Sequence, residues 1–312
     1  MSIIYNSEGK VDVETMRTNG TLPHEAYIKF DQRMVDVARD RLTIVQDLNS
    51  FGLVNRNYNL GDIVAKYEKL SDMDAAVVNM DGVTPASRDR VTYTEAGVPI
   101  PVFSKNFQIN ERQLQAGLNK GHSLANTMIT TSTRRVADSI NQMIFNGLPN
   151  FVTVDGLSVF GLTNHPNRNQ VAAAAAWGGV GSDPVADVEN MLAAAYADNF
   201  FGPFNLYVSK DHWSFIQGDY NANKGEKTFK ERFESFSDIN EVRAGDQLAD
   251  GSAVLVNMSD ETIELKVGQD FVNFEQPQTN RMQHDFTVMA AMAICIKADA
   301  NNNCGVVELT GS

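Results

Sequence analysis

The feature that most constrains the fold is a long helical pattern between Phe107 and Gly147. Apolar side chains recur there every three or four residues, which is the spacing of one helical face. They are Leu114, Leu118, Leu124, Met128, Val136, Ile140, Met143 and Ile144. A helix with a single apolar stripe is suited to lie under a sheet, and it is poorly suited to fill the centre of an enzyme.

Local signals divide this pattern and set its ends. Asn110 and Gln113 have the spacing of a capping box, so they are expected to start the helical region. Gly121 is expected to break it, with Ser123 capping a second helix that would be roughly 36 Å long. Gly147, followed by a proline two residues later, is a typical helix end.

Composition and charge narrow the class of protein. The chain has 312 residues, of which 43% are hydrophobic and 21% charged, as in globular proteins. Its net charge of -13 argues against a surface that grips nucleic acid through the phosphates. The N-terminus lacks the pattern of a signal peptide, and the longest apolar run, Phe286–Ile296, is too short to span a membrane. The chain is therefore expected to be made as a cytosolic protein.

The N-terminal region predicts an extended arm over residues 1–22 and then a helix. Thr21 and Pro23 open this helix, which is expected to run from His24 to Leu48. Its apolar residues follow a 3–4 spacing opposite a charged face. Such a helix could dock on its own domain or pack on a neighbouring subunit.

Residues 49–106 have a different character. Turn signals separate short β-prone runs such as Val91–Thr94 and Ile100–Phe103. The segment holds few large apolar clusters and cannot bury much surface by itself. It either folds back on the body or pairs with another chain, as edge strands can.

The middle of the chain predicts a compact α/β unit. Asp183 and Pro184 start a helix that runs to about Asn199. Alternating short elements follow, which favours an α/β architecture. These are a strand at Phe204–Ser209, a helix from Lys210 to about Gly218, a helix at 228–236, and strands at Ile239–Arg243 and Ser252–Asn257.

The C-terminal region is expected to be mostly strands. Ile263 and Leu265 alternate with Glu264 and Lys266, which is typical of a half-buried strand. A long strand is predicted at 286–297. Asn301–Asn303 would then form a hairpin turn, with the chain returning through 306–309.

No pattern in the sequence identifies catalytic chemistry. Five histidines are far apart, without the spacing of a metal site. They are His24, His122, His165, His212 and His284. The glycine-rich stretch 177–184 lacks the lysine of a phosphate-binding loop, and Arg134-Arg135 could bind phosphate or simply form a solvated helix face. Cys295 is expected to be a buried thiol, and a bridge to Cys304 is the alternative. No catalytic, cofactor-binding or metal-ligating residue is predicted.

The order of these elements resembles the major capsid proteins of tailed bacteriophages with the HK97 fold, and the related encapsulin shells. Four stretches carry the local resemblance: VPIPVFSKNFQINERQL, GLSVFGLTNHPN, GPFNLYVSKDHW and NEVRAGDQLADGSAVLVNM. The resemblance implies an α+β fold and divides the chain by position. Residues 1–48 would be the N-terminal arm, 49–106 the E-loop, 107–149 and 271–312 the P-domain, and 150–270 the A-domain. The loop at Asp219–Lys227 would face the centre of a capsomer.

The resemblance also implies a function. The chain would assemble, without a cofactor or enzymatic activity, into pentamers and hexamers of an icosahedral shell around double-stranded DNA. Separate scaffolding, portal or decoration proteins are conceivable partners, and no membrane is involved. The virion would be assembled in the cytoplasm of a bacterial host. An acidic chain suits a wall that encloses DNA without adhering to it, and a strongly basic inner surface would contradict that hypothesis.

One property of the family is not expected in this chain, and two alternative functions stay open. Some HK97-like proteins join an E-loop lysine to an asparagine of a neighbour; Lys66 and Lys69 lie in the corresponding region, but no reacting set can be matched, so this crosslink is not expected. One alternative function is an encapsulin-type shell with a protein cargo. The other is a cytosolic α+β enzyme whose site has no recognisable motif.

Overall fold

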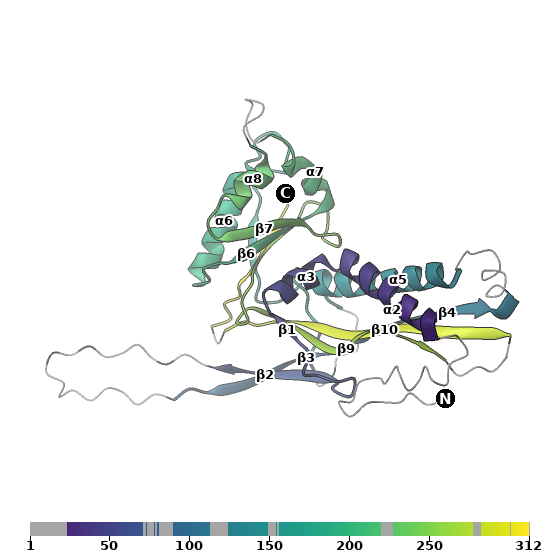
Figure 1. Ribbon diagram of the computed structural model, residues 1–312. Coiled ribbons are helices and arrows are strands. Elements are labelled where there is room, and N and C mark those ends of the chain that lie inside the picture. The colour runs from purple at the N-terminus through teal and green to yellow at the C-terminus, as the bar shows by residue number, and fades with distance from the viewer. Residues whose placement is uncertain are drawn as a thin grey trace.

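The computed structural model describes residues 24–70, 73, 78, 80, 90–112, 124–148, 154, 156–219, 227–276, 282–299 and 301–311. These residues form a four-stranded sheet, a five-stranded sheet and a separate two-stranded ribbon (Figure 1). Helices pack on both larger sheets, so the predicted mixed fold is confirmed. Within the described ranges, each helix is too short or too polar to cross a membrane.

The four-stranded sheet has the order β1-β9-β10-β4. Its strands are β1 (Val54–Asn55), β9 (Ile263–Glu275), β10 (Gln283–Ile296) and β4 (Val102–Asn110). β10 runs antiparallel to both β9 and β4, while β1 pairs in parallel with β9 over two residues. Almost all of β10 is buried, which confirms the long strand predicted there and explains its continuous apolar sequence.

The long helix α5 (Leu124–Asn146) lies across this sheet, beside α2 (His24–Arg41) (Figure 1). Val136, Ile140, Met143 and Ile144 are all buried in the core that includes the residues of β10. The predicted stripe is therefore confirmed from Val136 onward, together with the helix start at Leu124 and its end at Gly147, which has φ +66°. Met128 is half-buried, and the predicted stripe residues Leu114 and Leu118 lie outside the described residues. The predicted cap at residue 113 and break at residue 121 lie outside the described residues.

The N-terminal helix is interrupted at Leu42. α2 ends at Arg41, and α3 (Thr43–Ser50) continues after Leu42, whose ψ of 60° is not helical. The single helix predicted for this region is therefore wrong at that residue. The break allows Leu42 to be buried while α3 turns Ile44 and Leu48 into the core. Both helices dock on their own subunit, which was one of the two predicted arrangements.

The five-stranded sheet has the order β5-β11-β8-β6-β7. Its strands are β5 (Asn169–Ala172), β11 (Val306–Thr310), β8 (Ala253–Asn257), β6 (Phe204–Val208) and β7 (Ile239–Ala244). The helices of this unit are α6 (Pro184–Ala197), α7 (Lys210–Ile216) and α8 (Phe229–Glu234). A second apolar core joins the helices to the sheet. Three predicted helices and three predicted strands of the α/β unit are confirmed here.

The predicted C-terminal hairpin is wrong. β11 pairs antiparallel with β8 and parallel with β5, and it does not return along β10. Asn303 does close a turn, because its backbone N–H donates to Asp299 Oδ1 at 2.7 Å. That turn sends the chain from one sheet to the other, where Val307 and Leu309 enter the second core. The strand after residue 305 thus belongs to the same sheet as the strands between residues 169 and 257.

Other differences between prediction and structure concern the burial of one lysine and the positions of strands. Lys266 was expected on the exposed face of its strand, but it is buried, and that expectation is wrong. β9 begins at Ile263 and already lies in the four-stranded sheet. β5 lies before Asp183, in a stretch for which no strand was predicted. The two β-prone runs predicted near residues 91 and 100 become β3 (Tyr93–Pro99) and β4. Each strand begins two residues later than predicted, and the two strands end five and seven residues later.

Candidate functional site

The two-stranded ribbon is the part of the fold that the chain itself covers least. β2 (Val64–Leu70) and β3 pair antiparallel, from Val64 opposite Pro99 to Leu70 opposite Tyr93. The ribbon begins beneath the four-stranded sheet, on the side away from α2 and α5, and its other end projects past the body (Figure 1). We call β2 and β3 the arm.

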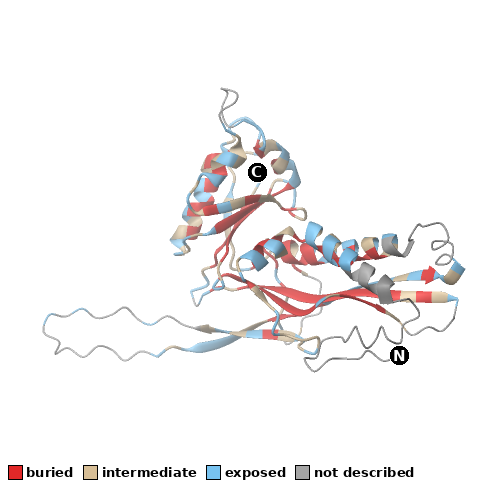
Figure 2. Ribbon diagram, viewed as in Figure 1, coloured by how far each residue is buried: buried red, intermediate tan, exposed pale blue. Residues whose placement is uncertain are grey.

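Burial along the arm is confined to its base. Ala65, Val98 and Pro99 are buried, whereas the far half of β3 is exposed (Figure 2). Tyr93, at the far end, has 68% of its surface exposed, and Ile63 beside the base is exposed to a similar degree. A two-stranded ribbon is marginally stable in water unless another surface covers one face. The arm therefore has the properties of a segment that is stabilised by a partner.

A hollow of about 220 Å³ lies where the arm meets the body. Its lining includes Tyr67 and Lys69 of β2, Leu157 and His165 of the segment that follows α5, and Ile294 of β10. His165 is buried, and this desolvation, with the charges of Lys69 and Arg168, lowers its pKa to about 4. The imidazole is thus neutral near pH 7, and its Nδ1 accepts the backbone N–H of Asn167 at 3.3 Å.

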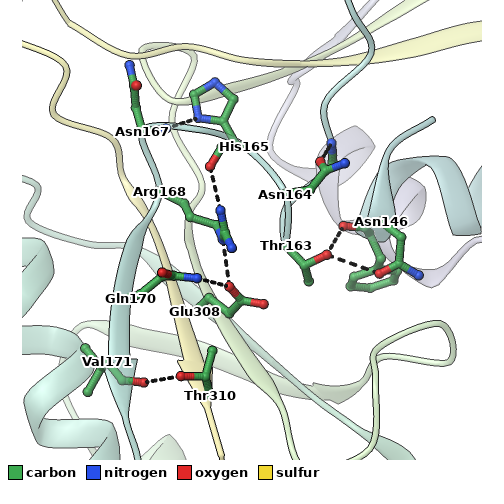
Figure 3. Close-up of polar contacts among 12 residues, drawn as sticks. Asn146, Thr163, Asn164, His165, Asn167, Arg168, Gln170, Val171, Glu308 and Thr310 are labelled. Carbon is green, nitrogen blue, oxygen red and sulfur yellow. Dashed lines mark hydrogen bonds and ion pairs between the residues drawn. The ribbon is translucent and has the colours of Figure 1, made fainter. Parts of the chain in front are cut away.

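The loop that carries His165 is fastened to the end of α5 (Figure 3). The hydroxyl of Thr163 donates to the carbonyl of Phe145 at 3.0 Å, and Asn164 Oδ1 accepts the N–H of Gly161 at 2.6 Å. Gly161 passes so close to Gly147 that a Cβ at Gly161 would lie 2.3 Å from the Gly147 nitrogen. This close approach explains why both positions, Gly147 and Gly161, are glycine.

The same loop is fastened to the five-stranded sheet (Figure 3). Arg168 Nε lies 2.6 Å from Glu308 Oε2 of β11, and its Nη1 donates to the His165 carbonyl at 2.9 Å. Gln170 Nε2 donates to the same Glu308 oxygen at 3.1 Å. We call residues 161–170 the junction loop, because it holds the arm base, α5 and the five-stranded sheet together.

A second polar connection joins α3 to the five-stranded sheet. Tyr207 of β6 donates its hydroxyl proton to Asp47 Oδ2 at 2.7 Å, and Arg243 of β7 lies 3.1 Å from Asp47 Oδ1. Burial raises the pKa of Asp47, although the Tyr207 hydrogen bond and the Arg243 charge oppose it. The N-terminal helices are therefore fixed to both sheets of the subunit.

The residues considered for chemistry in the sequence are not brought together. His212 stacks on Trp177 with ring centroids 4.5 Å apart, while His284 lies between Glu111 and Glu275. In the parts of the chain that the structure describes, no group of three histidine, cysteine or acidic side chains has the geometry to hold a metal ion. Arg134 and Arg135 are exposed on α5. His122 and most of the Asp219–Lys227 loop lie outside the described residues.

The two cysteines are unbridged. Cys295 and Cys304 are both buried free thiols, as expected for Cys295. Burial raises the pKa of each to about 11, so neither is a reactive thiolate at neutral pH.

The contacts of the junction loop and the connection through Asp47 were not predicted from the sequence, since the residues that form them lie far apart along the chain.

Comparison with known proteins shows which family the sequence matches and which solved structures have a similar fold. The family of unknown function DUF6260 matches residues 16–309. No curated protein matches the sequence. Among solved structures, the virus-like particle from Pyrococcus furiosus is similar, with 14% identity, a TM-score of 0.64, and coverage of 91% of this chain and 99% of that one.

Two phage structures are similar over slightly less of the chain. The capsid of Myoviridae phage XM1 has 11% identity and a TM-score of 0.64, covering 83% of this chain and 89% of that one. A structure of Mycobacterium phage Bobi has 15% identity and a TM-score of 0.60, covering 83% and 88%. The chain therefore belongs to the DUF6260 family, and its fold is the HK97-like fold of phage capsid proteins.

Proposed function

We propose that this chain is the major shell-forming subunit of a phage capsid. The observation that carries the proposal is the arm, which projects from a well-packed body and leaves the far half of β3 uncovered. Laying each arm over a neighbour would cover that half with a second copy. Repeated heterologous contacts of this kind close into a shell when the rotation between copies is that of a ring.

The regions predicted from the resemblance take roles in this proposal. Residues 1–48 are an N-terminal arm, 49–106 an E-loop, and 150–270 an A-domain whose Asp219–Lys227 loop faces the capsomer centre. The P-domain is built from 107–149 and 271–312, with β11 contributing to the sheet of the A-domain. Pentamers and hexamers assemble in the bacterial cytoplasm, with scaffolding, portal or decoration proteins as separate chains.

The proposed content of the shell is double-stranded DNA. The net charge of -13 fits a wall that does not adhere to phosphates. A shell around a protein cargo is the second candidate, because the similarity to the virus-like particle extends over 99% of that chain. Neighbouring genes distinguish the two: portal and terminase genes support the capsid, and a gene for a cargo enzyme supports the compartment.

Assembly is tested by electron microscopy and light scattering of the purified chain. We expect closed shells, or rings of five or six subunits. Tyr93→Glu and Ile63→Glu place a charge on the exposed part of the arm and its base, and should prevent assembly while leaving a soluble subunit. Val180→Glu is the matched control, since Val180 is a fully exposed apolar residue outside the arm.

The arm is not the assembly element if Tyr93→Glu forms the same shells as the wild type. A compact monomer or dimer of the wild-type chain at every concentration and salt tested, with and without its neighbouring structural proteins, would contradict the shell itself.

A further inference from the structure

Three side chains with complementary chemistry meet where β1 joins β9. Lys266 Nζ lies 2.6 Å from Glu264 Oε2. Asn55 donates its side-chain N–H to the other oxygen, Glu264 Oε1, at 2.8 Å. One carboxylate therefore holds an amine and a carboxamide at the same time.

The backbone places the residues that carry the amine and the carboxamide side by side. Asn55 and Lys266 are directly paired residues of the parallel β1–β9 ladder. Residues paired across two strands project their side chains to the same face of the sheet. The Lys266 side chain is only 5% exposed, and its ammonium lies 5.4 Å from the centre of the Tyr58 ring. The amine is thus largely shielded from water, whereas Asn55 is half-buried at the edge of the same site.

We propose that Lys266 and Asn55 join in an intramolecular isopeptide bond, with Glu264 carrying the proton between them. A proton first passes from the Lys266 ammonium to Glu264, which leaves a neutral amine. The amine nitrogen attacks Cγ of Asn55 and forms a C–N bond. The bond from Cγ to Nδ2 breaks as Glu264 gives its proton to that nitrogen. Glu264 then takes the second proton from the new amide nitrogen and passes it to the departing ammonia, which leaves as ammonium.

Burial and hydrogen bonding act on this proton transfer in opposite directions. Burial opposes the charged forms of both partners, and the neutral amine and carboxylic acid cost less in such a site. Before reaction the mutual hydrogen bond outweighs burial, so the pKa of Lys266 is raised and that of Glu264 is lowered. Fixing the reacting groups in one geometry replaces a slow bimolecular amide exchange with an intramolecular one.

A second lysine makes the assignment specific. Lys297 Nζ lies 3.1 Å from Glu264 Oε2 and also donates to the carbonyl of Asp260. Lys297 has no ladder partner in β1 and is more exposed than Lys266, so it serves to balance the charge of Glu264. Asn55, Glu264 and Lys297 line an open hollow of about 500 Å³, which gives ammonia a route to solvent.

The bond would reinforce a weak point. β1 pairs with β9 over only two residues, yet it links α2 and α3 to the sheet. A covalent bond between Asn55 and Lys266 would prevent that short strand from separating when the N-terminal helices are pulled.

Mass spectrometry of the full, denatured chain tests the proposal. We expect a mass lower than the sequence mass by one ammonia. Trypsin should not cleave after Lys266, and it should release a branched peptide that joins Leu42–Arg56 to Ala244–Arg281. A chain with the full sequence mass and normal cleavage after Lys266 would overturn the proposal, as would a mass gain at Asn55 from simple deamidation.

Four variants assign the roles. Lys266→Arg and Glu264→Gln should retain the full sequence mass, whereas the control Lys297→Arg should still lose ammonia. Asn55→Asp keeps the shape of the side chain and should lose water instead, giving the same final mass as the wild-type product. Loss of ammonia in Lys266→Arg would overturn the choice of amine. Loss of ammonia in Glu264→Gln would overturn the role of Glu264.

Discussion

The arm and the β9–β10 pair are both antiparallel two-strand units, but they have very different surroundings. β9 and β10 are buried along most of their length between α5, α2 and the rest of the sheet. β2 and β3 form a continuous ladder of seven pairs, and β3 remains exposed over its far half. Strand pairing is thus available to both, and coverage by other elements separates a stable body from a segment that needs a partner.

The junction loop is where the two regions meet, so the largest effect is expected there. Gly161→Ala would place a Cβ 2.3 Å from the backbone nitrogen of Gly147, and backbone cannot move aside cheaply. We expect a loss of about 3–5 kcal/mol in the free energy of unfolding, measured with urea. Gly156→Ala is the control: it has open space around the new Cβ but φ +77°, so its cost should be about 1 kcal/mol. Equal losses in the two variants would mean that the close approach does not matter.

The sequence predicted the elements whose signals are local. The apolar stripe of α5 and the capping residue Asp183 of α6, which accepts the N–H of Ala186, were readable within a few turns of helix. The weak apolar content of residues 49–106 also predicted a segment without a core of its own. These features depend on neighbours that are close in the chain.

Contacts between distant residues could not be predicted in this way. The strand at Val306 fits either sheet by its alternation, and only Val307 and Leu309 packing in the second core decides between them. The burial of Lys266 depends in part on the hydrogen bond that Asn55 donates to Glu264. Asn55 and Glu264 are 209 positions apart in the chain. Arg168 and Glu308 are 140 positions apart, and the sole hint was an acidic residue inside the apolar strand VVELT.

The arm base should also respond to acid. The folded-state pKa of His165, about 4, is below its ordinary value of 6.5, so the unfolded chain binds more protons between these values. Stability is therefore fully present above about pH 6.5 and is lost as the pH falls towards 4, by at most about 3 kcal/mol.

The measurement is the unfolding free energy of the wild type and of His165→Gln, between pH 7 and pH 4. As the pH falls through this window, the unfolding free energy of the wild type should decrease more than that of the variant, because glutamine does not titrate. A constant difference would show that His165 binds protons equally in both states. Deleting the arm residues that cover the hollow should also weaken the dependence.

The smallest expected effect compares one ion pair in each region. On the arm, Lys66 and Glu95 lie 3.3 Å apart, with 65% and 73% of their side chains exposed, so solvent screens the pair. In the junction, Glu308 is largely buried and accepts from both Arg168 and Gln170. Glu95→Gln should cost no more than about 0.5 kcal/mol in the isolated subunit. Glu308→Gln removes the charge that Arg168 requires and should cost about 1–3 kcal/mol. If Glu95→Gln destabilises assembled shells by far more than the isolated subunit, a neighbour must desolvate that pair, which would place this part of the arm in the contact between copies.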